Sequence, residues 1–128
     1  MNDFLNFICV GFTKCGTTWL YNVLSENSEI DTPILKEPCD YTENYYKGEV
    51  WQQSLYKNNG SLKSDFTNHY IFKTVAMDLI KEKNPNVKLL LLIRNPLERS
   101  FSHYKMLLST STTEGVTLID EQYGKIID

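Results

Sequence analysis

A glycine-bounded loop between an apolar run and an amphipathic segment constrains this chain more than any other feature. The apolar run covers residues 7–10, and the loop covers 11–16. Apolar side chains at Leu20, Val23 and Leu24 then follow the spacing of one helix face. A strand, a tight loop and a helix in this order direct backbone N–H groups and the positive end of a helix dipole toward an anion. The segment therefore predicts a phosphate-binding loop.

The side chains of this loop also suit an anion. Lys14 supplies a positive charge, and Thr17 and Thr18 supply hydroxyl donors beside it. Nucleotide hydrolases differ, because their pattern G-x-x-x-x-G-K-[ST] places Lys where this chain has Thr17. The best buried strand, 88–93, ends in Arg94 instead of the carboxylate with which such enzymes hold magnesium. These departures disfavour magnesium-dependent ATP or GTP hydrolysis and favour a ligand with a second anionic group.

Two segments, TKCGTTWL at 13–20 and LLLLIRNPLERSFSHY at 89–104, resemble the signature regions of sulfotransferases that use 3′-phosphoadenosine 5′-phosphosulfate (PAPS). In that family the first region binds the 5′-phosphosulfate and the second binds the 3′-phosphate. The resemblance covers most of the chain and implies a set of donor-binding residues. These are Thr13, Lys14, Cys15, Gly16, Thr17, Thr18, Trp19, Arg94 and Ser102.

Two further segments resemble elements of the heparan-sulfate-type branch of this family. KEPCDY at 36–41 resembles its KE-x-x-aromatic element, and GSLKSDF at 60–66 resembles its Lys-[Ser/Thr]-Pro element. Asp40 stands where an aromatic residue is usual, and Asp65 replaces the usual Pro. We expect these acids to lie near the acceptor and to disfavour a strongly anionic one by like-charge repulsion. The resemblance implies a hydroxyl or amine acceptor, on a carbohydrate or another small molecule.

The resemblance also implies catalytic roles. Sulfuryl transfer requires a base that takes the acceptor's proton. Glu37 is the predicted base, and His69 is the alternative if the cytosolic small-molecule branch is the better match. Lys63 is expected to steady the charge that develops at the leaving phosphate, and Lys14 could share this role.

Several of these residues also have simpler interpretations. Thr17 and Thr18 could cap the helix, since Thr is a good N-cap residue. Arg94 could pair with Glu98 on the following helix, an interaction that contributes little at a surface. Trp19 could stack on an adenine, but packing is the simpler interpretation of this residue.

Two other function classes stay open. A P-loop nucleotide kinase would need a magnesium-holding acid and a Lys directly after Gly16, and neither arrangement is found in the sequence. A degenerate or truncated sulfotransferase would bind 3′-phosphoadenosine nucleotides without turnover. The length of 128 residues keeps this second alternative open, because sulfotransferases of this type are expected to be about twice as long. We therefore expect the chain to be the N-terminal part of a single incomplete domain, 1–128.

Composition narrows the remaining possibilities. A net charge of -3 argues against a general nucleic-acid binder. The three cysteines form no C-x-x-C and favour a reducing, cytoplasmic compartment. The apolar run 7–11 is too short for a membrane span. His69 and His103 have no Cys, His or carboxylate partner at metal-ligand spacing, so no metal is expected.

The order of the expected elements indicates a fold class. Strands alternate with helices, which predicts a three-layer α/β domain of the P-loop type with a mostly parallel sheet, incomplete at its C-terminus. The apolar run 89–93 fits a strand buried on both faces. The expected elements are strand 4–10, helix 17–27, turn 31–33, helix 45–57, helix 75–83, strand 89–93, helix 96–108 and polar loop 109–115.

Overall fold

The computed structural model describes residues 4–58, 60 and 62–114. The chain forms two compact units, 1–93 and 94–128. The first unit contains the sheet, and the second contains one long helix. The expectation of a single domain stays a prediction.

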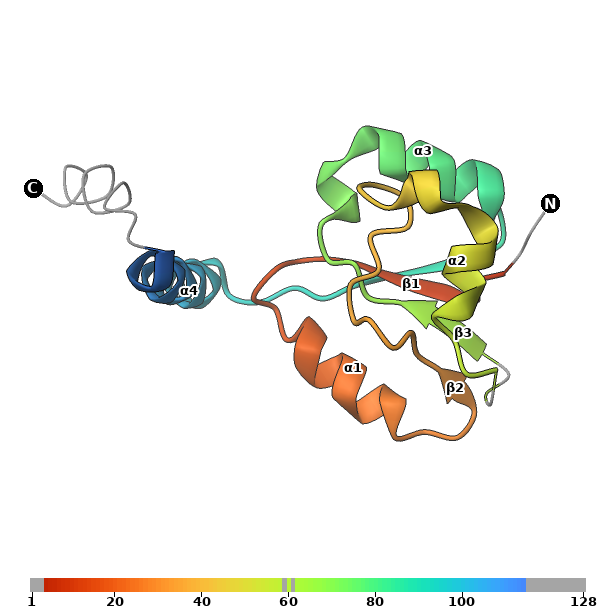
Figure 1. The fold of residues 1–128 in the computed structure, drawn as a ribbon. Helices are drawn as coiled ribbons and strands as arrows, with labels where there is room; N and C mark the ends of the chain where they lie inside the picture. Colours follow the sequence, from red (N-terminus) through yellow and green to blue (C-terminus); the bar gives the residue numbers. More distant parts are fainter. Residues whose placement is uncertain (1–3, 59, 61, 115–128) are drawn as a thin grey trace, which may run out of the picture. The chain divides into compact units, whose positions relative to one another are not determined.

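Four parallel strands form the sheet of the first unit (Figure 1). Their order is β2-β3-β1-β4, so the strand that leads into the predicted phosphate loop lies inside the sheet, between β3 and β4. The parallel sheet that the sequence predicts is therefore confirmed. The strands are β1 (Phe7–Gly11), β2 (Ile30–Asp31), β3 (Leu62–Asp65) and β4 (Lys88–Leu91).

Helices cover both faces of this sheet. Helix α1 (Thr17–Ser25) lies on one face, and α2 (Gly48–Ser54) and α3 (Thr74–Lys83) lie on the other (Figure 1). Two short 3₁₀ helices, η1 (Tyr45–Lys47) and η2 (Tyr70–Phe72), precede α2 and α3. The three-layer α/β architecture is therefore confirmed.

Alternate residues of β1 supply the two halves of the core. Ile8 and Val10 are buried in an apolar cluster that also contains Tyr70 and Ile80. Toward α1, the ring of Phe66 meets Phe7 edge to face with centroids 6.0 Å apart, and it meets Tyr21 of α1 at 5.4 Å. Because both faces of β1 are covered, its sequence is a continuous apolar run rather than an alternating one.

Two strands and one helix break differ from the expectation. The polar strands β2 and β3 were not predicted as strands, since two and four residues with Lys, Ser and Asp carry no strand periodicity. The helix expected over 45–57 is interrupted at Gly48, whose φ of 75° ends η1. This left-handed conformation favours glycine, which explains why the break falls there.

The prediction that β4 is buried on both faces is wrong. The side chains of Leu89, Leu90 and Leu91 are 37–49% exposed. In the described part of the chain β4 pairs with β1 alone and forms an edge of the sheet. An edge strand has a neighbour on one side only, so its leucines are covered less than those of a central strand.

The second unit begins at Arg94 and contains α4 (Pro96–Glu114). The Asn95 side-chain oxygen accepts hydrogen bonds from the backbone N–H groups of Leu97 (3.0 Å) and Glu98 (3.4 Å). Asn95 is thus the N-cap residue of α4. Pro96 is the first helical residue, which is where the sequence predicts the helix to begin. The polar loop expected over 109–115 is wrong, because 109–114 are helical and residue 115 lies outside the described residues.

Candidate active site

Three polar segments meet at the carboxyl edge of the sheet. The loop 12–16 follows β1, the segment 66–69 follows β3, and the segment 32–38 follows β2. Ligands of open parallel α/β sheets bind at this edge, because the loops after neighbouring strands lie together there. The predicted phosphate loop and the predicted base therefore come from adjacent parts of the fold.

The phosphate loop has the backbone conformation that an anion site requires. Gly16 has a φ of 95° and stands at the N-cap position of α1, and no side chain caps this helix. Lys14 also has a positive φ, 66°, and the Cys15 N–H closes a turn on the Phe12 carbonyl at 3.2 Å. The first N–H groups of an uncapped helix need partners from outside the helix. A phosphate or sulfate group at this end would supply them.

The loop's side chains differ in their access to solvent. The suggestion that Thr17 or Thr18 caps α1 is wrong, since Gly16 holds that position without a side-chain hydrogen bond. Thr17 is buried and Thr18 is exposed. Trp19 is 68% exposed, so it is not the packed residue that the simpler interpretation requires. An exposed indole beside a phosphate loop is available to a ligand's ring.

A chain of hydrogen bonds joins the phosphate loop to the predicted base. The Thr13 hydroxyl donates to Asn68 Oδ1 (3.1 Å), and Asn68 Nδ2 donates to Glu37 Oε1 (2.8 Å). Lys36 Nζ lies 2.6 Å from the same carboxylate oxygen. The Glu37 side chain remains 37% exposed, so its carboxylate reaches solvent. The structure thus brings Thr13 and Glu37 to one place through Asn68, a residue that the sequence did not indicate.

Lys63 lies away from the phosphate loop, toward the other end of the sheet. In the register of β3 against β1, Ser64 is opposite Phe7, which places Lys63 level with the start of β1. The five residues of β1 separate this level from the phosphate loop. At about 3.3 Å per residue, the separation along the strand is roughly 16 Å. Its Nζ lies 3.8 Å from Asp31 and 5.6 Å from the ring centroid of Phe4. The structure does not bring Lys63 together with Lys14 and Glu37.

The end of β3 carries an acid at a position where P-loop enzymes can hold magnesium. Asp65 ends β3 next to β1, but its side chain is fully buried. One oxygen accepts the Thr67 N–H (2.7 Å), and the other accepts the Tyr70 hydroxyl (2.9 Å). Burial, followed by the charge of Asp40, raises the pKa of the Asp65 carboxyl to about 7. Asp65 is therefore a structural acid with its oxygens occupied, which disfavours a magnesium-dependent kinase.

Asp65 should make stability depend on pH. Its folded-state pKa of about 7 lies above the value of an unfolded Asp, so its contribution is fully present below about pH 4 and is lost as pH rises toward 7. Asp65→Asn cannot ionise. We therefore compare the free energy of unfolding of Asp65→Asn with that of the unsubstituted protein in urea titrations. The difference, variant minus unsubstituted protein, should rise by roughly 3 kcal/mol between pH 4.5 and 7.5. Asp78→Asn, on the exposed face of α3, should show no such trend. Parallel curves for Asp65→Asn and the unsubstituted protein would contradict this assignment.

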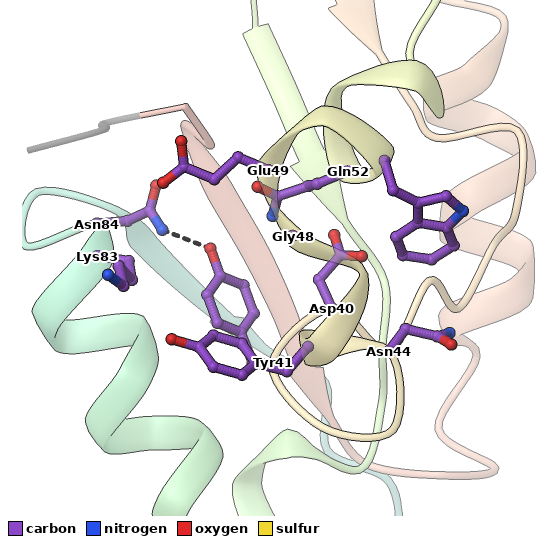
Figure 2. A pocket seen from close by; sticks show the side chains of 10 residues that line it. Asp40, Tyr41, Asn44, Gly48, Glu49, Gln52, Lys83 and Asn84 are labelled. Atoms are coloured by element: carbon purple, nitrogen blue, oxygen red, sulfur yellow. Dashed lines mark hydrogen bonds between the residues drawn. The ribbon is translucent and has the colours of Figure 1, made fainter.

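Asp40 is buried in a separate pocket. A cavity of about 230 Å³ lies between α2 and the end of α3, and Figure 2 shows the Asp40 carboxylate among its lining residues, near Gln52. Neither Asp40 oxygen accepts a hydrogen bond from the described residues. Desolvation by burial raises the pKa of this carboxyl to about 6. None of the predicted donor-binding or catalytic residues lines this cavity. Asp40 and Asp65 are both buried, so neither carboxylate is exposed to an acceptor, and their expected nearness to the acceptor stays a prediction.

The residues predicted for the 3′-phosphate lie in the second unit. Arg94 Nε lies 3.1 Å from Glu98 Oε2, which is the ion pair that the simpler interpretation anticipates. Both side chains are exposed, so this pair contributes little and an incoming anion can replace Glu98. Ser102 lies in the second turn of α4.

Comparison with known proteins identifies the class. The model of the sulfotransferase domain family matches residues 6–125, and the chain belongs to this family. It is 32% identical over 104 residues to the membrane-associated sulfotransferase kil1 of Dictyostelium discoideum, and 29% identical over 104 residues to the human heparan sulfate glucosamine 3-O-sulfotransferase 6. These matches cover 77% and 80% of this chain. The crystal structure of a sulfotransferase from Alicyclobacillus acidocaldarius matches with a TM-score of 0.70 and 27% identity over 84% of this chain.

The matches cover this chain more fully than they cover the relatives. The chain spans 22% of the Dictyostelium protein, 30% of the human protein and 51% of the bacterial chain. Among the described residues, no helix is both long enough and apolar enough to cross a membrane. The three cysteines are free thiols, and the cytoplasmic location that they favour stays a prediction.

Proposed function

We propose that this chain forms the donor-binding part of a PAPS-dependent sulfotransferase that transfers a sulfuryl group to a hydroxyl or amine of a carbohydrate. The observation that carries the proposal is the hydrogen-bond chain from Thr13 through Asn68 to Glu37. It connects the phosphate loop to a carboxylate that is accessible to an acceptor. Family membership supports the class of reaction.

The geometry of the loop supports the proposed donor-binding roles. The uncapped N-terminus of α1 and the charge of Lys14 suit the 5′-phosphosulfate of PAPS. Thr13, Cys15, Gly16, Thr17 and Thr18 supply the surrounding backbone and hydroxyl groups. Trp19 is available for stacking. Arg94 and Ser102 remain the predicted contacts of the 3′-phosphate.

The chemistry divides between two residues of the first unit. When bound, PAPS supplies a sulfuryl group on a good leaving phosphate. As the acceptor oxygen or nitrogen bonds to sulfur and the bond from sulfur to the bridging oxygen breaks, Glu37 takes the acceptor's proton. Lys14 stabilises the negative charge that develops on the departing phosphate. Asn68 and Lys36 hold one Glu37 oxygen in place, which leaves the other for the proton.

A carbohydrate acceptor is the best-supported substrate class. Three of the matched relatives are, by their names, heparan sulfate glucosamine 3-O-sulfotransferases. Asp40 and Asp65 are buried, so neither carboxylate can contact an anionic sugar chain directly. A heparan sulfate oligosaccharide is therefore a suitable acceptor probe.

Label transfer tests the proposal directly. We expect label from sulfur-labelled PAPS to appear in the oligosaccharide in the presence of the protein, and no phosphoryl transfer from ATP with magnesium. Phosphoryl transfer without sulfuryl transfer would overturn the proposal in favour of a nucleotide kinase. Donor binding with no transfer to oligosaccharide or small-molecule acceptors would leave a non-catalytic donor-binding module. The position of Lys63, away from the carboxyl edge, is the observation that favours this alternative.

Asn68 provides a prediction on the positioning of the base. Replacing Asn68 with Ala removes the donor that fixes Glu37 Oε1 and the acceptor of the Thr13 hydroxyl. We expect kcat to fall about tenfold while the Kd for 3′-phosphoadenosine 5′-phosphate (PAP) stays within about twofold, since a net hydrogen bond contributes about 1 kcal/mol. Steady-state kinetics and calorimetry separate the two quantities. Asn22→Ala on α1 is the control, and an equal loss of PAP affinity in Asn68→Ala would contradict a positioning role.

A further inference from the structure

A second group of chemically reactive side chains lies beside the proposed site. Cys39, Glu43 and His69 each offer one potential ligand atom, and these atoms all lie within 4.8 Å of one another. His69 Nε2 and Glu43 Oε2 are 3.4 Å apart. This group leaves no local signal in the sequence, because Glu43 and His69 are 26 positions apart, far beyond the short spacings that mark metal ligands. Here the ends of two different loops bring the residues together.

The ligand types select a class of metal ion. A thiolate, an imidazole and a carboxylate form the donor set of zinc sites, whereas magnesium and calcium prefer oxygen ligands alone. Bonds of about 2.0–2.3 Å in tetrahedral geometry place ligand atoms roughly 3.3–3.7 Å apart. The separation of His69 from Glu43 already has this value. All three ligand atoms lie within 4.8 Å of one another, so side-chain movements of about 1 Å would bring them to these separations.

The two loops that carry the ligands are held in place independently of any metal. The Cys39 N–H donates to the buried Thr67 hydroxyl (3.1 Å), which ties one loop to the other. The Cys39 carbonyl accepts the N–H groups of Thr42 (3.1 Å) and Asn44 (3.0 Å), so Cys39 and Glu43 share one tight turn. The His69 ring lies against fully buried Tyr70, with centroids 5.7 Å apart. Such preformed support around the ligands is what a metal site requires.

We propose that Cys39, Glu43 and His69 bind a zinc-class divalent cation, with water in the fourth position. Binding replaces the Cys39 thiol proton, which is released to the buffer, so that the thiolate and the Glu43 carboxylate balance the two positive charges. The site differs from the proposed catalytic residues but adjoins them. Cys39 is two residues from Glu37, and His69 directly follows Asn68. A bound cation would therefore clamp the two loops that position the base.

Titration of the full chain, freed of metal with a chelator that is then removed, tests the site. Calorimetry with Zn²⁺ should give one ion per chain. Co²⁺ should give the intense near-ultraviolet absorption of a cobalt–thiolate bond together with the visible bands of a tetrahedral ion. Cys39→Ser should abolish the thiolate absorption, and His69→Gln and Glu43→Gln should each weaken Zn²⁺ binding at least about tenfold. These titrations contain no PAPS, so their outcome is independent of the proposed function.

The chain offers matched controls for both reactive residue types. Cys15→Ser removes another partly accessible thiol, and His103→Gln removes the other histidine. Both should keep one Zn²⁺ per chain with affinity within about twofold. Binding that survives in Cys39→Ser, or that is lost equally in Cys15→Ser, would overturn the proposal. If Cys39→Ser fails to fold by circular dichroism, the exposed Glu43→Gln variant decides. A cobalt spectrum and zinc affinity unchanged in that variant would reject the three-ligand site.

Discussion

Glu37→Gln should reduce the rate of sulfuryl transfer by about 10²–10⁴-fold, the usual contribution of a general base. The substitution is nearly isosteric, and the remaining amide oxygen can still accept from Asn68 and Lys36 at the place where Oε1 does now. The hydrogen-bond chain to Thr13 therefore persists, and only the ability to take a proton is lost. We expect the Kd for PAP to stay within about twofold, since Glu37 does not contribute to the phosphate loop. Initial rates with labelled PAPS and calorimetry with PAP measure the two effects separately.

Glu82→Gln is the matched control for this variant. Glu82 is an exposed residue of α3 that pairs with Lys83 at 3.6 Å, and such a pair contributes little. Its rate should equal that of the unsubstituted protein. Full transfer activity in Glu37→Gln, with PAP binding intact, would remove Glu37 as the base and restore His69 as the alternative.

Lys14→Met should weaken PAP binding by about 10–100-fold. A charge-assisted hydrogen bond to a phosphate contributes roughly 1.5–3 kcal/mol, and each 1.4 kcal/mol is a tenfold change in Kd. Met keeps the length of the side chain. Met and Lys tolerate the positive φ of this position equally well. The loss of affinity therefore measures the effect of the charge and not a change in backbone strain. Calorimetric titration at two salt concentrations measures the affinity, and the variant should show the weaker salt dependence.

Lys81→Met on the exposed side of α3 is the control for a change in overall charge. It should bind PAP within about twofold of the unsubstituted protein. Equal affinities for PAP in Lys14→Met and Lys81→Met would show that Lys14 is an ordinary solvated loop residue.

The segment from β1 to α1 could be predicted because local signals agree there. An apolar run, a loop that ends in Gly16 and a helical apolar face each point to the same structure, and α1 begins at Thr17 as expected. The start of α4 is similarly local, since Asn95 caps the helix and Pro96 fixes its first φ. Its extension past residue 108 was missed, because Ser and Thr can bond to carbonyls of the preceding turn and stay helical, as Ser109 does with Met106.

The rest of the site depends on contacts that leave no local signal. The role of Asn68 arises only because β3 pairs with β1 and delivers the segment 66–69 to the phosphate loop. The same register places Lys63 at the end of β3 away from the phosphate loop, and a motif-like string does not reveal which end of a strand it occupies. Burial of Asp65 inside a polar strand was equally invisible, because tertiary packing rather than periodicity imposes it.

Calorimetric titration with PAP, with ADP and magnesium as the comparison, tests the central claim most directly. The site consists of an uncapped helix end and Lys14, and both oxygens of Asp65 at the end of β3 already accept hydrogen bonds. Such a site should bind PAP and discriminate against ADP with magnesium. Selective binding of PAP is the result that we predict. Binding of ADP with magnesium, and none of PAP, would contradict the assignment of this site to a sulfuryl donor.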